Sequence, residues 1–303
     1  MTFIAILVGL TPSFLLVGLG GLLRSRLSVN AWQGLDKLNF EILFPALLFV
    51  AASQRPLEIG QVVGIAPLVW GVLAVGLIVG YGARRFGPER FLDFAGAWQT
   101  AWRFNTALAF IAIATTDMAD VSVMAVAVGM AVPASNVLAV SVLSRGDSLG
   151  LWGTVKKVAL NSFFVASLAG VLVGLSGLRV PGPVLAPLEM LSAAAIPIAL
   201  ISIGATMNWG ALARLNRFSA IICVTKLIVM PITALALAMG LGLESGVAVV
   251  LVIWAALPTA SASHVLASGF GADRELSATL VAQTTLLSAI TLPVWITLAE
   301  VLF

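Results

Sequence analysis

The sequence predicts an all-α polytopic membrane protein with about ten transmembrane helices, arranged as two inverted five-helix repeats. Three observations predict this fold. Hydrophobic residues make up 60% of the 303-residue chain and charged residues only 10%, with a mean hydropathy of +1.10. The loops alternate in lysine and arginine content, and helix-breaking motifs recur half a chain apart. Because soluble domains carry about 25% charged residues, this composition indicates an integral membrane protein.

Composition also excludes several classes of protein. The net charge of +3 is scattered, without a basic run, so nucleic-acid binding has no support. The single cysteine, Cys223, excludes an internal disulfide and a cysteine-based metal cluster. The apolar runs lack the alternation of barrel strands, so helices are the expected spanning element. We expect no metal and no cofactor other than a coupling ion, sodium or a proton.

The spans follow from runs of about 20 mostly apolar residues. The first run has no positive residue ahead of it and is followed by Arg24 and Arg26, the reverse of a secretory signal, so we expect a retained span. The predicted spans lie near residues 3–23, 34–53, 61–82, 92–114, 119–143, 155–176, 185–207, 216–240, 245–267 and 276–302.

Basic residues alternate sharply between successive loops. One set of loops carries Arg24, Arg26, Arg84, Arg85, Arg90, Arg145, Lys156, Lys157, Arg214, Arg217 and Arg274. The opposite set carries only Arg55 and Arg179, among Glu58, Asp117, Asp120 and Glu244. By the positive-inside rule the first set is cytoplasmic, which places both termini on the outer, periplasmic side of the cell inner membrane.

Two breaker motifs recur at nearly the same offset. Asn105 precedes Pro258 by 153 residues, and Pro45 precedes Pro197 by 152 residues. The repeats are therefore predicted as residues 1–150 and 151–303. Five spans in each half force the halves into opposite orientations, and interrupted helices in matching halves indicate a transporter's binding site.

Polar residues near these interruptions are the candidate substrate-binding groups. Arg103, about eleven residues into its span, is a candidate fixed cation for an anion, or else a structural arginine bonding free carbonyls. Asn105 and Pro258 break two helices at equal depth, so the half-helices are expected to cross with their N-termini favouring an anion. The predicted substrate-binding residues are Arg103, Asn105, Thr106, Asn136, Pro258, Thr259 and Ser261.

Other polar residues have more ordinary interpretations. The hydroxyls near the breaks commonly bond their own helix's carbonyls, and buried amides commonly bond neighbouring helices. Lys37 and Glu41 are expected to pair four residues apart. Lys226 can snorkel only with strain, and the only histidine, His264, is either a proton carrier or a hydrated or hydrogen-bonded side chain. The candidate coupling or support residues are Lys226, His264 and Gln283.

At these positions the chain resembles the auxin efflux carrier family of bacterial and plant transporters. The resemblance covers nearly the full length, and the order and spacing of its segments are more specific than any single motif. The matching segments are residues 38–40, 44–49, 103–106, 136–138, 196–200 with Gly204, 226–231, 257–260 and 265–267.

The resemblance implies a ten-helix inverted-repeat carrier of the bile-acid/sodium-symporter-like architecture. Spans four and nine would cross in a mobile transport domain of helices 3–5 and 8–10, against a scaffold of helices 1, 2, 6 and 7. It also implies a small organic anion, often a carboxylate, bound near Asn105. Ala107, Ala109 and Ala112 stand where the family commonly has glycines and a proline, which leaves the extent of unwinding of this helix open.

Rival functions are weaker. Crossing half-helices can also line an anion channel, and a non-transporting membrane sensor is a further alternative. Ser176 lies in a Gly-Leu-Ser-Gly motif similar to that of intramembrane serine proteases, but His264 falls at the opposite membrane side. We therefore expect a secondary transporter rather than an enzyme. Its expected substrate is a small organic anion, such as a dicarboxylate or an auxin-like acid. It is expected to work by elevator-type alternating access in the lipid bilayer, and a homodimer is a candidate assembly.

Overall fold

The computed structural model describes residues 2–54, 59–113, 115–119, 121–145, 156, 159–210, 212 and 215–303. Every regular element in these ranges is helical. The α-helices are α1 (Thr2–Leu23), α2 (Val29–Leu38), α3 (Phe44–Ser53), α4 (Ile59–Tyr81), α5 (Phe91–Trp98), α6 (Thr106–Ile113), α7 (Val121–Ser144), α9 (Ser162–Ser176), α10 (Gly182–Thr206), α11 (Arg217–Val224), α12 (Met230–Leu241), α13 (Ser245–Ala256), α14 (Ala262–Gly269) and α15 (Arg274–Leu302). The π-helical turns are η1 (Asn39–Leu43) and η4 (Thr225–Val229), and the 3₁₀ turns are η2 (Gly82–Phe86) and η3 (Gln99–Ala101).

Helical residues occupy each of the ten predicted span ranges. In the described residues, five helical segments are long and apolar enough to cross a membrane, so the chain is a polytopic membrane protein: Val63–Phe86, Val123–Ser144, Gly182–Thr206, Arg217–Leu241 and Arg274–Leu302. Arg55, Glu58, Asp120, Lys157 and Arg214, which contribute to the charge alternation, lie outside the described residues, as does the repeat boundary at residues 150 and 151.

Two helical segments contain a π-helical turn directly before a helix that carries a proline in its first turn. The turn η1 precedes Pro45 in α3, and η4 precedes Pro231 in α12. Proline has no N–H, so the carbonyl four residues earlier loses its ordinary partner, and a π turn is one way for a helix to absorb this. At the second site the Trp295 Nε1 donates to the Leu227 carbonyl at 2.8 Å, which supplies the donor that Pro231 lacks.

Two helix pairs pack closely through glycine. Helix α1 packs along α10, and α9 packs along α3. A Cβ on Gly204 would lie 1.9 Å from the Val17 carbonyl oxygen, and one on Gly170 would lie 2.8 Å from the Phe49 carbonyl oxygen. Small residues permit this backbone approach, and close packing supplies much of the association energy of helices in lipid.

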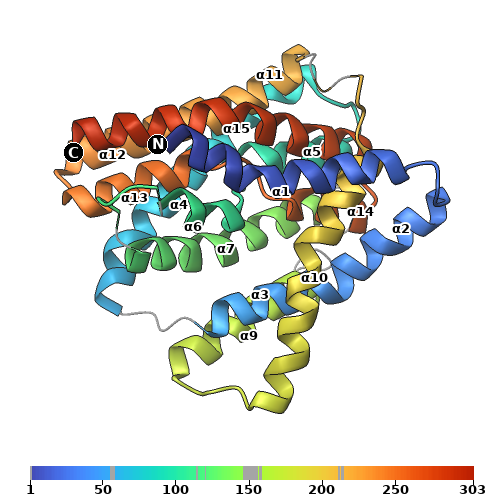
Figure 1. Ribbon diagram of the computed structural model, residues 1–303, viewed down its shortest axis with the longest axis horizontal. Coiled ribbons are helices and arrows are strands. Elements are labelled where there is room, and N and C mark those ends of the chain that lie inside the picture. Colours follow the sequence, from blue (N-terminus) through green and yellow to red (C-terminus); the bar gives the residue numbers. More distant parts are fainter. Residues whose placement is uncertain are drawn as a thin grey trace.

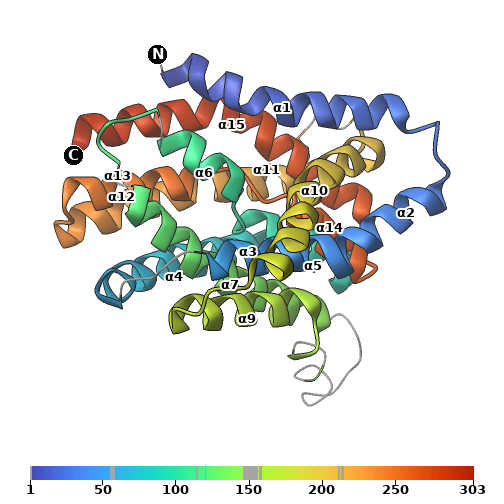
Figure 2. The same cartoon turned by 60° about the horizontal axis from the view of Figure 1, so that its bottom comes forward.

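The interrupted helices lie at the centre of the structure. From Ala248 to Ala256, α13 is buried on every face, as expected for a helix that is apolar all round. Helices α1 and α15 run side by side along one edge, and both ends of the chain lie at the same end of the bundle (Figures 1 and 2). This arrangement encloses the two breaks between α3 and α10 on one side and α7 and α15 on the other.

Candidate binding site at the helix crossing

The two interruptions predicted from the sequence meet in the fold. The first helix ends with η3 at Ala101 and resumes as α6 at Thr106, and the second ends at Ala256 and resumes as α14 at Ala262. The Asn105 N–H donates to the Pro258 carbonyl at 2.7 Å. The two predicted interruptions therefore lie against each other. The first helix breaks fully, ahead of the alanine-rich stretch that follows Asn105.

Side chains tie the two breaks together a second time. The Gln99 Nε2 donates to the Ser263 carbonyl at 3.1 Å and to the Gly96 carbonyl at 3.2 Å. The rings of Phe104 and Trp254 pack edge to face with centroids 5.1 Å apart. Backbone, amide and aromatic contacts thus hold the crossing as one unit.

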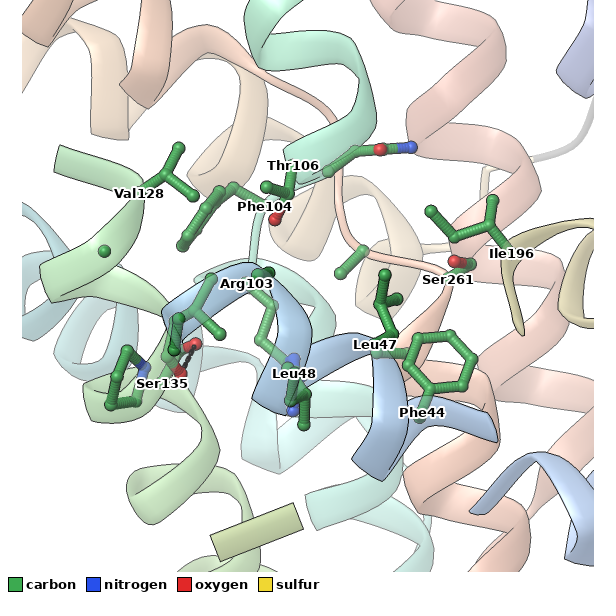
Figure 3. Close-up of a pocket in the computed structure, with 18 residues that line it drawn as sticks. Phe44, Leu47, Leu48, Arg103, Phe104, Thr106, Val128, Ser135, Ile196 and Ser261 are labelled. Carbon is green, nitrogen blue, oxygen red and sulfur yellow. Dashed lines mark hydrogen bonds between the residues drawn. The ribbon is translucent and has the colours of Figure 1, made fainter. Parts of the chain in front are cut away.

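A cavity of about 250 Å³ lies against this crossing. Helix α3 supplies one apolar wall, α7 supplies another, and the two breaks supply the polar groups. Figure 3 shows the labelled side chains that line the cavity, with Arg103 among them. Its lining residues are Phe44, Leu47, Leu48, Ala51, Ala52, Arg103, Phe104, Asn105, Thr106, Val128, Gly129, Val132, Pro133, Ser135, Ile196, Ala260, Ser261 and Ala262.

Arg103 is the cation of this cavity. It is 4% exposed. Its Nη2 donates to the Asn136 Oδ1 at 2.8 Å and its Nη1 to the Gln99 Oε1 at 3.4 Å, both neutral amides. Its Nε has no hydrogen-bond partner, and no carboxylate of the described residues lies within 4.0 Å of it. A buried guanidinium without a counter-charge is costly, so the site is electrostatically prepared for an anion.

The half-helices add a second source of positive potential. Helix α6 begins at Thr106 and α14 begins at Ala262, and both residues line the cavity. Helix N-termini carry free N–H groups and the positive end of the helix dipole. On the other side of the break, the Lys226 Nζ donates to the Ala255 carbonyl at 3.0 Å, where α13 ends. Lys226 is fully buried, so the snorkelling interpretation is wrong and this cation stabilises a helix C-terminus.

The predicted site residues thus divide into three groups. Arg103, Asn105, Thr106 and Ser261 line the cavity. Asn136 and Pro258 lie behind it, as hydrogen-bond acceptors for Arg103 and Asn105. Thr259 is buried outside the lining, and Gln283 is buried on α15. The hydroxyls of Thr259 and Ser263 have no hydrogen-bond partner, so the expectation that they bond their own helix is wrong.

His264 belongs to a separate polar cluster. It is fully buried rather than hydrated, and its Nδ1 lies 3.2 Å from the Arg274 carbonyl. Its Nε2 lies 3.4 Å from the Oδ1 of Asp36, a buried carboxylate. The predicted Lys37–Glu41 pair is present at 3.9 Å on the exposed surface beside it. The protease alternative finds no support, because the Ser176 hydroxyl is exposed and donates to the Val173 carbonyl, away from His264.

Sequence reasoning missed Gln99 and Asp36. Gln99 stands four residues before Arg103, a helical spacing that places both on one face, and this spacing could have indicated the pair. Asp36 is the only aspartate in its predicted span, and an intramembrane acid is a functional candidate by default. The apolar wall from α3 has no such signal, because Leu47 and Leu48 are ordinary residues of a membrane helix.

Comparison with known proteins finds similarity to membrane transport proteins. Residues 152–296 match the model of a family described as "Membrane transport protein". A protein of Rhizobium meliloti (strain 1021) named "Putative malonate transporter" is 27% identical over 296 residues, which cover 92% of this chain and 91% of the relative. An "Uncharacterized transporter" of Methanothermobacter thermautotrophicus is 30% identical over 132 residues, 43% of each chain.

These matches agree with the apolar helices and the crossed interruptions. The first relative covers 92% of the chain, in agreement with a resemblance that runs over nearly its full length. Both relatives are named as transporters, and neither name describes an enzyme. The comparisons therefore support a membrane transporter similar to the auxin efflux carrier family, rather than an enzyme.

Proposed function

We propose that the protein is a secondary active transporter of a small organic anion that works by elevator-type alternating access. The observation that carries this proposal is Arg103, a buried guanidinium that lines the cavity with neutral amides as its hydrogen-bond acceptors. A carboxylate entering the cavity would complete the charge balance. Arginine binds carboxylates with two parallel hydrogen bonds, which fixes both the position and the orientation of the anion.

The cavity favours a substrate with one carboxylate on Arg103 and a small body. Among the lining residues Arg103 is the one cation, and most of the others are apolar. The hydroxyls of Thr106 and Ser261 and the half-helix N-termini offer the remaining polar contacts. Because a relative over 92% of the chain is named as a malonate transporter, malonate and other short carboxylates are the first substrates to test.

The walls of the cavity support the elevator mechanism. Phe44, Leu47 and Leu48 on α3 and Ile196 on α10 belong to the proposed scaffold. The residues from α6, α7 and α14 belong to the proposed transport domain. A site between the two groups of helices becomes accessible from one side of the membrane or the other when one group slides past the other.

The packing of helix pairs supports the inverted repeat. If the first five helices correspond to the second five, α1 corresponds to α9 and α3 to α10. The pair α1–α10 then corresponds to the pair α9–α3, and these two pairs are the closely packed ones. The corresponding pairs α1–α15 and α9–α7 are also in contact. The proposed location remains the cell inner membrane with both termini outside, and a homodimer remains a candidate assembly.

Binding tests Arg103 directly. Purified protein in lipid nanodiscs is screened by thermal shift against short mono- and dicarboxylates, with sodium and pH varied. We expect Arg103→Gln to weaken binding of the best ligand by about 30-fold, the equivalent of about 2 kcal/mol for a lost charge-assisted hydrogen bond. Arg103→Lys should retain part of the affinity, because the lysine ammonium keeps the positive charge but lacks the two parallel N–H donors of the guanidinium.

Arg179→Gln is the matched control, because Arg179 lies in an exposed loop. Normal binding by the Arg103→Gln variant would contradict the site. In proteoliposomes, saturable uptake with substrate counterflow is expected of a carrier. Ohmic currents without counterflow would instead support the channel alternative.

A further inference from the structure

A buried cluster around Asp36 joins elements from both ends of the chain. Asp36, on α2, is 1% exposed. Its Oδ2 accepts from the Arg274 Nη2 at 2.7 Å and from the Ser268 hydroxyl at 3.0 Å. Its Oδ1 accepts a hydrogen bond from the Ser202 hydroxyl and lies 3.4 Å from the His264 Nε2. The carboxylate is thus surrounded by groups from α10, α14 and α15.

His264 lies between two hydrogen-bond acceptors. Its Nδ1 faces the Arg274 carbonyl at 3.2 Å, and its Nε2 lies 3.4 Å from the Asp36 carboxylate, an ion-pair contact outside hydrogen-bond geometry. A neutral imidazole has one N–H and one lone pair, so in either tautomer a lone pair faces an acceptor oxygen. The doubly protonated ring is the one state that offers a donor to both oxygens. The geometry therefore provides a place for one additional proton.

The cluster spans the boundary between the two proposed groups of helices. Asp36 and Ser202 belong to α2 and α10, in the scaffold, whereas His264, Ser268 and Arg274 belong to α14 and α15, in the transport domain. Arg274 also donates to the Thr206 hydroxyl at the end of α10, at 2.9 Å. Figure 2 shows α2, α10 and α14 together at one end of the bundle. Sliding of one group past the other would separate Asp36 from His264 and Arg274.

Neighbouring charged groups are already engaged elsewhere. Lys37 pairs with Glu41, and Arg90 pairs with Asp93 at 3.5 Å. Asp93 also accepts from the Asp273 backbone N–H, Asp273 caps the start of α15, and Glu275 accepts from Asn208. Among the described residues of the elements packed against the cluster, the remaining charged groups are Glu189 on α10, which accepts from Gln54, and Glu300 near the far end of α15. His264 is therefore the group in contact with Asp36 that can change charge near neutral pH.

We propose that Asp36 and His264 form a proton-binding site, and that protonation of His264 holds the transport domain against the scaffold. This inference rests on the proposed elevator function. With His264 protonated, Asp36 binds two cations across the boundary. When His264 loses its Nε2 proton to water, which reaches the cluster beside the 20%-exposed Arg274 side chain, a lone pair faces the carboxylate and the hold weakens. Movement away from α2 is then easier at higher pH.

Because His264 is the only histidine in the chain, its protonation can be observed directly. Protein labelled with ¹⁵N-histidine, purified with a histidine-free tag, is titrated in nanodiscs by NMR between pH 5 and 9. We expect one imidazole that titrates to the doubly protonated form. Asp36→Asn should move the midpoint of this titration by about one pH unit or more, because it removes the carboxylate that faces the ring.

Glu41→Gln is the matched control, since it removes one negative charge from the exposed part of the same helical segment. It should leave the titration unchanged. The proposal is overturned if His264 does not titrate in this range, or if Asp36→Asn and Glu41→Gln give the same midpoint. This measurement requires no transport, so its failure is distinct from failure of the proposed function.

Transport supplies the second readout. In counterflow with equal pH on both sides, we expect exchange by the wild type to rise at least fivefold between pH 5.5 and pH 8. We expect His264→Gln to change less than twofold over the same range with the same substrate. Equal pH dependence in both proteins would overturn the link between this proton and domain movement, whereas absence of exchange at every pH in the wild type would contradict the proposed function.

Discussion

The chemistry of the proposed binding site depends on which hydrogen-bond acceptors surround Arg103. The Asn136 and Gln99 side chains orient the guanidinium but leave its charge uncompensated. A carboxylate at either place would form an internal ion pair, and Arg103 would then no longer attract an anion. Neutral amides therefore fit a site that binds an anion reversibly, because they position the cation without neutralising it.

The neutral amide at residue 136 leads to a prediction for its replacement by a carboxylate. Asn136→Asp should place a carboxylate about where the amide oxygen now lies, 2.8 Å from the Arg103 Nη2. We expect a folded protein that is at least as thermally stable as the wild type but loses substrate-induced stabilisation and uptake. Asn161→Asp is the control, because Asn161 caps α9 and aspartate is an equally good N-cap. Unimpaired uptake by Asn136→Asp would contradict the assigned role.

At the scale of elements, the breaks and the close packing have different causes. Pro258 removes a backbone donor, but on the other side the chain breaks at residues 102–105 without a proline. There the Gln99 amide and the bond from Asn105 to the Pro258 carbonyl replace contacts that a continuous helix would make. The first break therefore depends on its partner helix, whereas the second has a local cause.

The α1–α10 contact gives a prediction for stability. Gly204→Ala should drive α1 and α10 apart, because its Cβ would lie 1.9 Å from the Val17 carbonyl oxygen. Overpacking of this kind costs about 1–3 kcal/mol. Gly18→Ala, on α1 with nothing within 4 Å of the added Cβ, should change stability by less than about 1 kcal/mol. Thermal unfolding in the same lipid compares the two variants, and equal losses would disprove the close-packing explanation.

At the scale of the whole molecule, the charge alternation predicts which side each loop faces. In a Cys223→Ser background, Ser25→Cys tests a predicted cytoplasmic loop and Leu178→Cys a predicted outer one; both positions are exposed and Cys223 is buried. A membrane-impermeant maleimide applied to intact cells should label Leu178→Cys and should label Ser25→Cys only after lysis. The opposite pattern would reverse the topology, and labelling of both in intact cells would contradict the span assignment between them.

Much of the fold could be predicted because membrane helices are long and apolar. Each predicted range holds helix, and Asn105 and Pro258 identified two segments that meet in space. The π-helical turns η1 and η4 were not predicted, although Pro45 and Pro231 were visible in the sequence. A proline shows that a helix is disturbed, but whether it kinks, breaks or takes a π turn depends on its neighbours, such as Trp295 at the Leu227 carbonyl.

The sequence by itself determined the class of protein, the interrupted pair and the candidate cation Arg103, since composition, spacing and an intramembrane charge are local properties. The tertiary structure decided which polar groups act together. It placed Asn136 behind Arg103, Lys226 at the end of α13, and the candidate coupling residue His264 in a cluster with Asp36. The physical reason is that the role of a buried polar group depends on the groups that it contacts. In these three cases the contacted residues lie 29 to 228 positions away along the chain.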